Sequence, residues 1–184
     1  MSVLNENTII GASAAGGDYE IEQSLRFNDD DNAYLSRTPS SAGNRKTFTL
    51  SMWVKLGEVS AFQYFAGAIP SGYIQFGTGS SGEIRVHQDA PALSCITTAL
   101  LRDPSAWYHV LFKVDTTQAT SSDRLKIYVN GEEQTLSTAT YPTLNADTNW
   151  NSAHAQGVGA RGDGDTPFDG YLSEVNFIDG QALT

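Results

Sequence analysis

Apolar and polar residues alternate along most of the chain, and the alternation has a period of two. Residues 48–56 read FTLSMWVKL, in which every second side chain from Phe48 to Leu56 is apolar. The segments 107–115 (WYHVLFKVD), 124–131 (RLKIYVNG) and 171–178 (YLSEVNFI) repeat the pattern. Because successive side chains of a strand point to opposite faces, these segments predict strands that bury one face. The apolar spacing of an amphipathic helix is nearly absent.

Shorter strand candidates fill the spaces between these segments, and turn-forming residues separate them. They are 24–27, 34–37, 63–68, 73–76, 83–87 and 93–98. Asn130 and Gly131 give the strongest hairpin signal, because a tight type I′ turn needs both central residues in the left-handed region. Many short strands with polar turns and no helices indicate two stacked antiparallel sheets. We therefore predict an all-β fold, a two-sheet antiparallel β-sandwich.

In the last predicted strand, the same alternation places the side chains on two opposite faces. Tyr171, Val175 and Phe177 are expected on one face, against Leu172, Glu174 and Asn176 on the other. A strand so close to the end of the chain is expected to close one of the two sheets. Its loss would leave an unpaired edge and an exposed apolar row.

The first 23 residues differ from the rest in composition. The run NENTIIGASAAGGDYEIEQ is rich in Gly, Ala and Ser and has few apolar side chains to bury. Small residues with free backbone groups suit an extended segment that adds to the edge of a neighbouring sheet. We therefore divide the chain into an N-terminal extended arm, 1–23, and a single sandwich domain, 24–184, and we expect the arm to provide oligomeric contacts.

Five motifs in order resemble those of laminin-G-like, concanavalin A-like jelly-roll domains. They are SLRFNDDDNAYLS, FTLSMWVKL with Trp53, WYHVLFKVD, LKIYVNGEEQ and FDGYLSEVNFIDGQAL. The resemblance extends from Ser24 to Thr184. It implies a concanavalin A-like jelly roll in which the last strand pairs beside the first, SLRF.

A narrower resemblance concerns tailed bacteriophages. The runs TPSSAGNRKTFTLSMWVK and EVNFIDGQAL are similar to jelly-roll domains of phage fibre and virion-surface proteins. This implies a non-catalytic structural or adhesion protein of the virion, made in the host bacterial cytoplasm. Its partners would be other capsid or tail proteins, and a homo-oligomer, by analogy a trimer, would be expected. The start MSVLNENTII lacks the basic region and apolar core of a signal peptide, which agrees with this expectation.

The net charge limits the possible binding partners, and the single cysteine excludes an internal disulfide. The chain has 184 residues, 21 acidic and 11 basic, with a formal net charge of −10. Such a charge disfavours nucleic acid and anionic membranes, because their phosphates would repel it. No apolar run approaches the roughly 20 residues of a membrane helix. Cys95 has no partner for an internal disulfide, and its neighbours Leu93 and Ile96 predict a buried thiol.

The pattern of acidic and histidine residues gives no enzyme signature. Glycoside hydrolases on this sandwich need two carboxylates on one strand face, in a run such as Glu-x-Asp-x-x-Glu. The chain has no such run in the matching region, and Glu20 and Glu22 lie in the arm. The histidines, His87, His109 and His154, lack metal-ligand spacing. We expect no catalytic activity, and glycoside hydrolysis stays a remote alternative.

A calcium site is the only cofactor to consider. Relatives hold Ca²⁺ with oxygens from the opening strand pair and from an acidic residue of the closing motif. The resemblance therefore points to Asp29, Asp31, Asn32 and Glu174, since Ca²⁺ takes six to eight oxygen ligands. Ser173 stands where relatives carry the closing acid. The alternative is a solvated acidic turn, in which Asp and Asn side chains bond to their own backbone.

Four aromatic residues in or near predicted loops are candidates for sugar binding. They are Tyr64, Tyr73, Tyr141 and Trp150. Exposed rings stack on the apolar faces of pyranoses, whereas rings in a sandwich more often pack in the core or at its rim. A lectin-like module that recognises a host-surface glycan is therefore the alternative to a purely structural virion protein.

Overall fold

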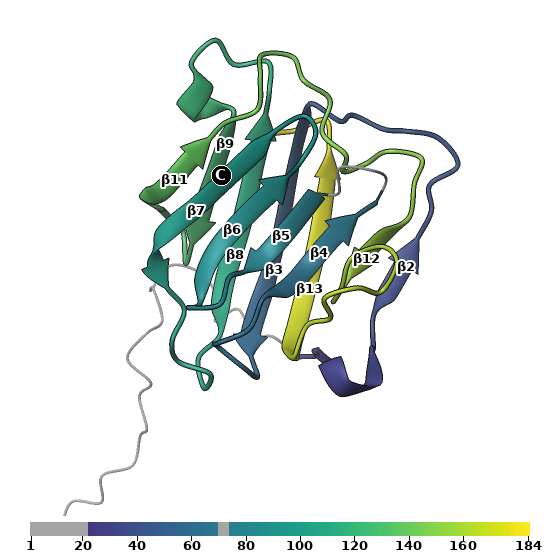
Figure 1. The fold of residues 1–184 in the computed structure, drawn as a ribbon, viewed down its shortest axis with the longest axis vertical. Helices are drawn as coiled ribbons and strands as arrows, with labels where there is room; N and C mark the ends of the chain where they lie inside the picture. The colour runs from purple at the N-terminus through teal and green to yellow at the C-terminus, as the bar shows by residue number, and fades with distance from the viewer. Residues whose placement is uncertain (1–21, 70–73) are drawn as a thin grey trace, which may run out of the picture.

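The computed structural model describes residues 22–69 and 74–184, and these residues form two stacked sheets (Figure 1). The six-stranded sheet contains, in spatial order, β1 (Leu25–Phe27), β13 (Gly170–Asp179), β3 (Thr47–Leu56), β8 (Tyr108–Asp115), β9 (Leu125–Val129) and β10 (Glu132–Glu133). The seven-stranded sheet contains β11 (Leu136–Thr140), β7 (Leu93–Leu100), β6 (Glu83–Gln88), β5 (Ile74–Thr78), β4 (Gln63–Ala68), β12 (Gln156–Val158) and β2 (Leu35–Arg37).

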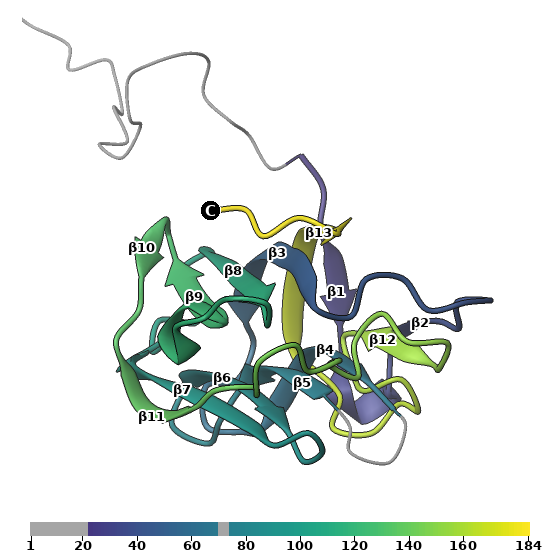
Figure 2. The same ribbon diagram turned by 90° about the horizontal axis from the view of Figure 1, so that it is seen from above.

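Every strand pair is antiparallel, and this confirms the predicted two-sheet sandwich. Two short 3₁₀ turns, η1 (Asp29–Asp31) and η2 (Ser121–Asp123), are the helical elements of the described residues. Within that part of the chain, no helix has the length and apolar character that a membrane crossing requires. Figure 2 shows the two layers edge on, with β13 between β1 and β3.

The core lies between the two sheets and is centred on Phe76. Its ring centroid lies 5.0 Å from that of Phe112, 5.4 Å from that of Trp150 and 6.4 Å from that of Phe48. Edge-on and tilted arrangements of this kind suit aromatic quadrupoles. The predicted inner face of β3, from Phe48 to Leu56, is almost completely buried. The alternation therefore gives the correct inner face for this strand.

The closing strand β13 departs from simple alternation because it contains a β-bulge. Ser173 pairs with Trp53 and Asn176 pairs with Ser51, so two residues, Glu174 and Val175, lie opposite one on β3. Glu174 adopts a φ of 49°, in the left-handed region that such bulges use. The extra residue shifts the phase of every side chain that follows it.

The predicted faces of the closing strand are therefore partly wrong. Leu172 pairs with the core residue Val54, and Phe177 pairs with the core residue Leu50, so Leu172 and Phe177 share the inner face. Tyr171 pairs with Lys55 and lies on the outer face. The expected pairing of the last strand with the first is confirmed, because Leu172 lies opposite Leu25.

Truncation of Phe76 is expected to lower the free energy of unfolding by about 3–5 kcal/mol, because the change removes a ring from the centre of the core. Urea or guanidinium denaturation of Phe76→Ala would measure this loss. Leu144→Ala is the control, since Leu144 is exposed and its removal should change stability by less than about 0.5 kcal/mol. Equal effects of the two changes would contradict the placement of the core.

The buried thiol of Cys95 predicts a pH dependence of stability. Burial raises its pKa from 9.0 to about 12, so the folded chain keeps a proton that the unfolded chain releases above pH 9. The stability contributed by Cys95 is thus complete below pH 9 and falls as pH rises toward 12. At pH 10 the loss is about 1.4 kcal/mol. Denaturation curves of the wild type and of Cys95→Ala should diverge in this range, and parallel pH profiles would refute the prediction.

Candidate functional site

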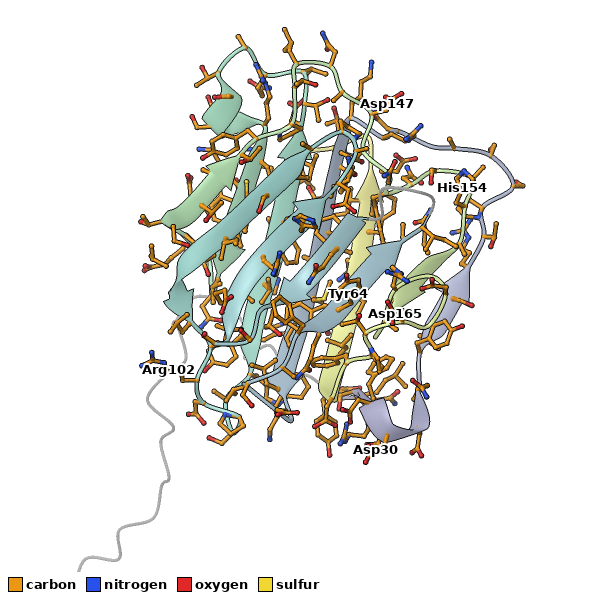
Figure 3. All side chains as sticks on the ribbon, in the orientation of Figure 1. Asp30, Tyr64, Arg102, Asp147, His154 and Asp165 are labelled. Atoms are coloured by element: carbon orange, nitrogen blue, oxygen red, sulfur yellow. The ribbon has the colours of Figure 1, made fainter. Side chains whose placement is uncertain are left out.

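The outer face of the seven-stranded sheet carries a cluster of polar and aromatic side chains on β4, β5 and β6. In β6, Ile84 and Val86 enter the core, so Arg85 and His87 point outward. In β5, Phe76 enters the core and Gln75 therefore lies on the outer side. This face is turned toward the viewer in Figure 3.

Glycines leave space between these outward side chains. Gly77 of β5 pairs with Tyr64 on one side and with Arg85 on the other. Gly67 of β4 pairs with Gln75, which in turn pairs with His87. A Cβ atom at position 77 would collide with the carbonyl oxygen of Gln63, so the close approach of the two strands requires glycine there.

Two donors at this face are buried and have no acceptor among the described residues. Gln75 is only 3% exposed, and its Nε2 atom has no hydrogen-bond partner. The Nε atom of Arg85 is likewise buried without a partner, while its guanidinium lies 5.0 Å from the ring centroid of the half-exposed Phe62. An unsatisfied buried donor costs about 1–3 kcal/mol, which an oxygen of a bound molecule or a water would recover.

The segment that follows β12 forms a wall beside this face. A Cβ atom on Gly157 would meet the carbonyl oxygens of Ala160 and Arg161, so this segment lies against the sheet. Arg161 donates to Asp163 from Nε at 2.7 Å and from Nη2 at 2.8 Å, and it also pairs with Asp165 at 2.9 Å. Figure 3 labels Tyr64 and Asp165 on this side of the molecule.

One guanidinium, that of Arg161, pairs with both carboxyl groups of the wall. The hydrogen bonds from Arg161 lower the pKa of Asp163 below its usual value. Asp163 is therefore held as a carboxylate by the guanidinium of Arg161. The clearly shifted carboxyl groups of the described residues are Asp103, Asp115 and Asp163, and all three pKa values are lowered. A glycosidase acid needs a raised pKa, so these groups do not suit that role.

Of the four aromatic residues predicted to bind sugar, the three that the structure describes do not form one site. Tyr64 lies at the candidate face but is almost completely buried. Trp150 packs in the core against Phe76 and Phe177. Tyr141 lines a separate hollow near β9 and β11, and Tyr73 lies outside the described residues. The rings of Tyr64 and Trp150 are thus not open to stack on a pyranose in this structure.

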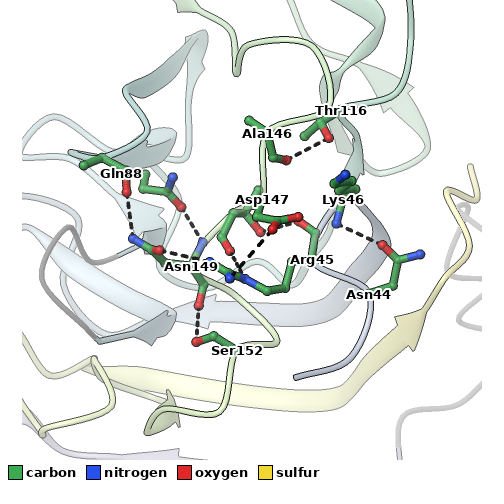
Figure 4. Close-up of polar contacts among 11 residues, drawn as sticks. Asn44, Arg45, Lys46, Gln88, Thr116, Ala146, Asp147, Asn149 and Ser152 are labelled. Carbon is green, nitrogen blue, oxygen red and sulfur yellow. Dashed lines mark hydrogen bonds and ion pairs between the residues drawn. The ribbon is translucent and has the colours of Figure 1, made fainter. Parts of the chain in front are cut away.

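Hydrogen bonds hold the loop that carries the buried Trp150 (Figure 4). Arg45 donates from Nε to the carbonyl oxygen of Thr148 at 2.6 Å, and the backbone N–H of Asn149 donates to Oε1 of Gln88 at 2.7 Å. Asn149 also donates to the carbonyl oxygen of Ala90. These bonds satisfy polar groups that would otherwise be buried unpaired, and they hold the indole over the core.

The structure separates Glu174 from the other three predicted calcium ligands. Asp29, Asp31 and Asn32 lie at η1, where Asn28 donates to Oδ2 of Asp31 at 2.7 Å. The pairing of β1 with β13 places η1 beyond Gly170, whereas Glu174 lies past the opposite end of β1. Within residues 22–69 and 74–184, no group of three or more His, Cys, Asp or Glu side chains could hold a metal ion.

The sequence analysis did not single out Gln75 or Phe62. Arg85 and His87 lie on a predicted strand, at positions that point to the same side. Alternation in EIRVHQ predicts that Arg85 and His87 share a face. It does not predict which strands lie beside them, and the glycines that open the face come from β4 and β5.

Comparisons with known structures identify the fold. Domain 4 of AbnA, a GH43 extracellular arabinanase from Geobacillus stearothermophilus solved in complex with arabinotriose, matches with 19% identity and a TM-score of 0.60, over 88% of this chain and 83% of that chain. Mouse laminin α1 domains LG4-5 match with 16% identity and a TM-score of 0.61, over 94% of this chain and 46% of theirs. The CBM40 domain of Ruminococcus gnavus IT-sialidase matches with 12% identity and a TM-score of 0.53, over 88% and 94%.

At these identities the likeness concerns the fold alone. No curated protein sequence matches this chain. A family model described as the concanavalin A-like lectin/glucanases superfamily, Laminin_G_3, matches residues 28–184. This region spans nearly all of the described sandwich and confirms the resemblance to laminin-G-like, concanavalin A-like domains. The chain belongs to the concanavalin A-like lectin/glucanases superfamily.

Proposed function

We propose that the chain is a non-catalytic carbohydrate-binding module that holds an oligosaccharide on the outer face of its seven-stranded sheet. The observation that carries the proposal is the pair of buried, unpaired donors on this face, Nε2 of Gln75 and Nε of Arg85. They lie on adjacent paired strands, whose backbone hydrogen bonds hold them in place before a ligand arrives.

The chemistry of the face suits a sugar. Saccharides present hydroxyl or carboxylate oxygens as acceptors, and they also have apolar C–H faces. Gln75 and Arg85 offer donors to the oxygens, and the half-exposed ring of Phe62 offers an apolar surface. Gly77 keeps the floor between Tyr64 and Arg85 free of a side chain. A site of few convergent polar groups beside an aromatic ring is typical of small-ligand recognition.

The structural neighbours support this proposal through the fold they share with the chain. The arabinanase domain was solved with arabinotriose, and the Ruminococcus gnavus CBM40 domain was solved with α2,3 sialyllactose. Hydrolysis is less well supported, because the carboxylates of the neighbouring wall, Asp163 and Asp165, are both paired with Arg161. An acid with a lowered pKa is a poor proton donor at neutral pH.

Replacement of Arg85 is expected to weaken glycan binding at least about tenfold, because a charged hydrogen bond contributes about 1.5–3 kcal/mol. A glycan array would identify the ligand, and calorimetric titration would compare the wild type with Arg85→Ala and Gln75→Leu. Arg26→Ala is the matched control, since Arg26 lies on the outer side of the other sheet, over Tyr171. The absence of any glycan ligand, or equal affinities of all variants, would overturn the proposal.

We further propose that the module serves attachment or assembly at a virion surface. The support comes from the sequence resemblance to phage jelly-roll domains and from exposed apolar side chains that gather on one side of the sandwich. Leu25 and Leu35 are each 54% exposed and line the same hollow. Exposed apolar surface of this kind marks contact sites.

An antibody raised against the chain is expected to label purified virions, and the chain should appear in their protein composition by mass spectrometry. Labelling of lysate protein alone, with none in washed particles, would contradict the virion setting. That result would leave the glycan-binding proposal intact, because glycan binding is measured on the isolated chain.

A further inference from the structure

Arg85 differs from the other partly buried arginines because its Nε donor has no acceptor. The arginines that are partly buried are Arg45, Arg85, Arg124 and Arg161. Arg45 and Arg124 donate to backbone carbonyl oxygens, and Arg161 donates to carboxylates. Among the described residues, the Nε atom of Arg85 has no hydrogen-bond partner, and no acidic side chain forms an ion pair with this arginine.

The guanidinium of Arg85 therefore lacks a counter-ion within the described part of the chain. A charge that is withdrawn from water without a partner raises the free energy of the folded state. The ring of Phe62, 5.0 Å away, stabilises the cation through its π face, but it gives the Nε–H no oxygen acceptor. Acidic residues outnumber basic ones by 21 to 11, so the missing partner does not reflect a shortage of carboxylates in the sequence. An anion from another molecule would fill this role.

The carboxylates around this face have partners of their own. Glu83 lies two residues before Arg85 on the same side of β6, but its Oε2 atom accepts from the backbone N–H of Ser81 at 3.0 Å. Oδ1 of Asp89 lies 3.0 Å from Nε2 of His87. The net charge of −10 acts on a ligand mainly at low salt, because the Debye length is about 8 Å at 0.15 M. At close range, the free cation of Arg85 decides which charge this face attracts.

Gln75 adds a second unpaired donor at a diagonal position. In the register of β5 and β6, Gln75 lies opposite His87, and Gly77 lies opposite Arg85. Diagonal residues on paired antiparallel strands are about 7–8 Å apart, a distance that long side chains span. The side chain of Gln75 is 3% exposed, and its Nε2 atom has no acceptor in the part of the chain that the structure describes. Both donors therefore reach a group that lies over Gly77, where no side chain intervenes.

A carboxylate fits this pair of donors better than a hydroxyl group does. It offers two oxygens with about four lone-pair positions, enough to accept from both side chains. It also neutralises the cation, and its planar shape matches the planar edge of a guanidinium. On the basis of the glycan-binding function proposed above, we infer that the ligand is an acidic sugar, such as a uronic or a sialic acid. Its carboxylate lies over Gly77 and accepts hydrogen bonds from Arg85 and Gln75.

A glycan array tests the class of ligand on the full chain. The array carries uronic acid, sialylated, sulfated and neutral oligosaccharides. Every bound glycan is expected to contain a carboxylate, and the first two groups show which kind of acidic sugar supplies it. Reduction of the carboxyl groups of the best-bound glycan to hydroxymethyl groups removes the charge and keeps the rest of the sugar. Calorimetric titration of the wild type should show an affinity at least about tenfold lower for the reduced glycan.

Arg85→Gln, titrated with both glycans, isolates the pairing of the two charges. The variant keeps an amide donor but loses the cation. It is expected to lower the affinity for the acidic glycan at least about tenfold and that for the reduced glycan less than about twofold. Gln75→Leu, which removes the second donor, should weaken binding of the acidic glycan at least about fivefold. A variant that only disturbed the fold would weaken both glycans equally.

Arg26→Gln is the matched control. Arg26 also lies over an aromatic ring, 5.4 Å from the centroid of Tyr171, but it pairs with Asp169 and belongs to the other sheet. The variant loses the same charge as Arg85→Gln, so it reports any effect of net charge from a distance. Its affinity for the acidic glycan should stay within about twofold of the wild type.

The possible failures of this inference and of the glycan-binding function are distinct. Binding of neutral or sulfated glycans alone, or equal affinities of the wild type for the acidic glycan and its reduced form, would overturn the acidic ligand and leave glycan binding intact. Equal losses on both glycans in Arg85→Gln would show that Arg85 acts through the fold and would overturn its assigned contact. The absence of any bound glycan would overturn both proposals together.

Discussion

The structure depends on the packing of aromatic rings between two antiparallel sheets. Phe76 contacts Phe48 and Phe112 of the opposite sheet and Trp150 of a connecting loop, so one cluster joins both layers. The core takes the inner faces of both sheets, and the strands hold the outward side chains at defined spacings.

The outer face of the seven-stranded sheet illustrates this division. Arg85 projects outward because its neighbours Ile84 and Val86 are in the core, and Gln75 does so because Phe76 is. The donors of the candidate site are thus positioned by the same alternation that builds the core. Gly77, between Tyr64 and Arg85, leaves the position between these two residues without a side chain.

The sandwich also leaves part of one edge of β13 unpaired, because β1 covers only Gly170 to Leu172 on that side among the described residues. A closed barrel has no strand edges, whereas a sandwich must cover or blunt the edges it leaves. Here the bulge at Glu174 turns the strand where β1 ends, and the groove beyond it exposes Leu35 and Phe177. The candidate glycan-binding face on β4, β5 and β6 and the hollow lined by Leu25, Leu35 and Leu172 lie on different sides of the fold.

Local residue patterns were enough to predict most of the strands, the inner face of β3 and the two-layer fold, because a pleated strand alternates with a strict period of two, but they did not predict β11 or β12. FTLSMWVKL therefore indicates its core face without any knowledge of its partners. The same rule was partly wrong for β13, because a bulge is defined by the register with β3 and not by the strand alone. The tertiary structure also decided that Trp150 is buried, that Asp29 and Glu174 lie apart, and that Gln75, Arg85 and Gly77 meet on one face. These contacts join residues far apart in the chain, and only the pairing of strands brings such residues together.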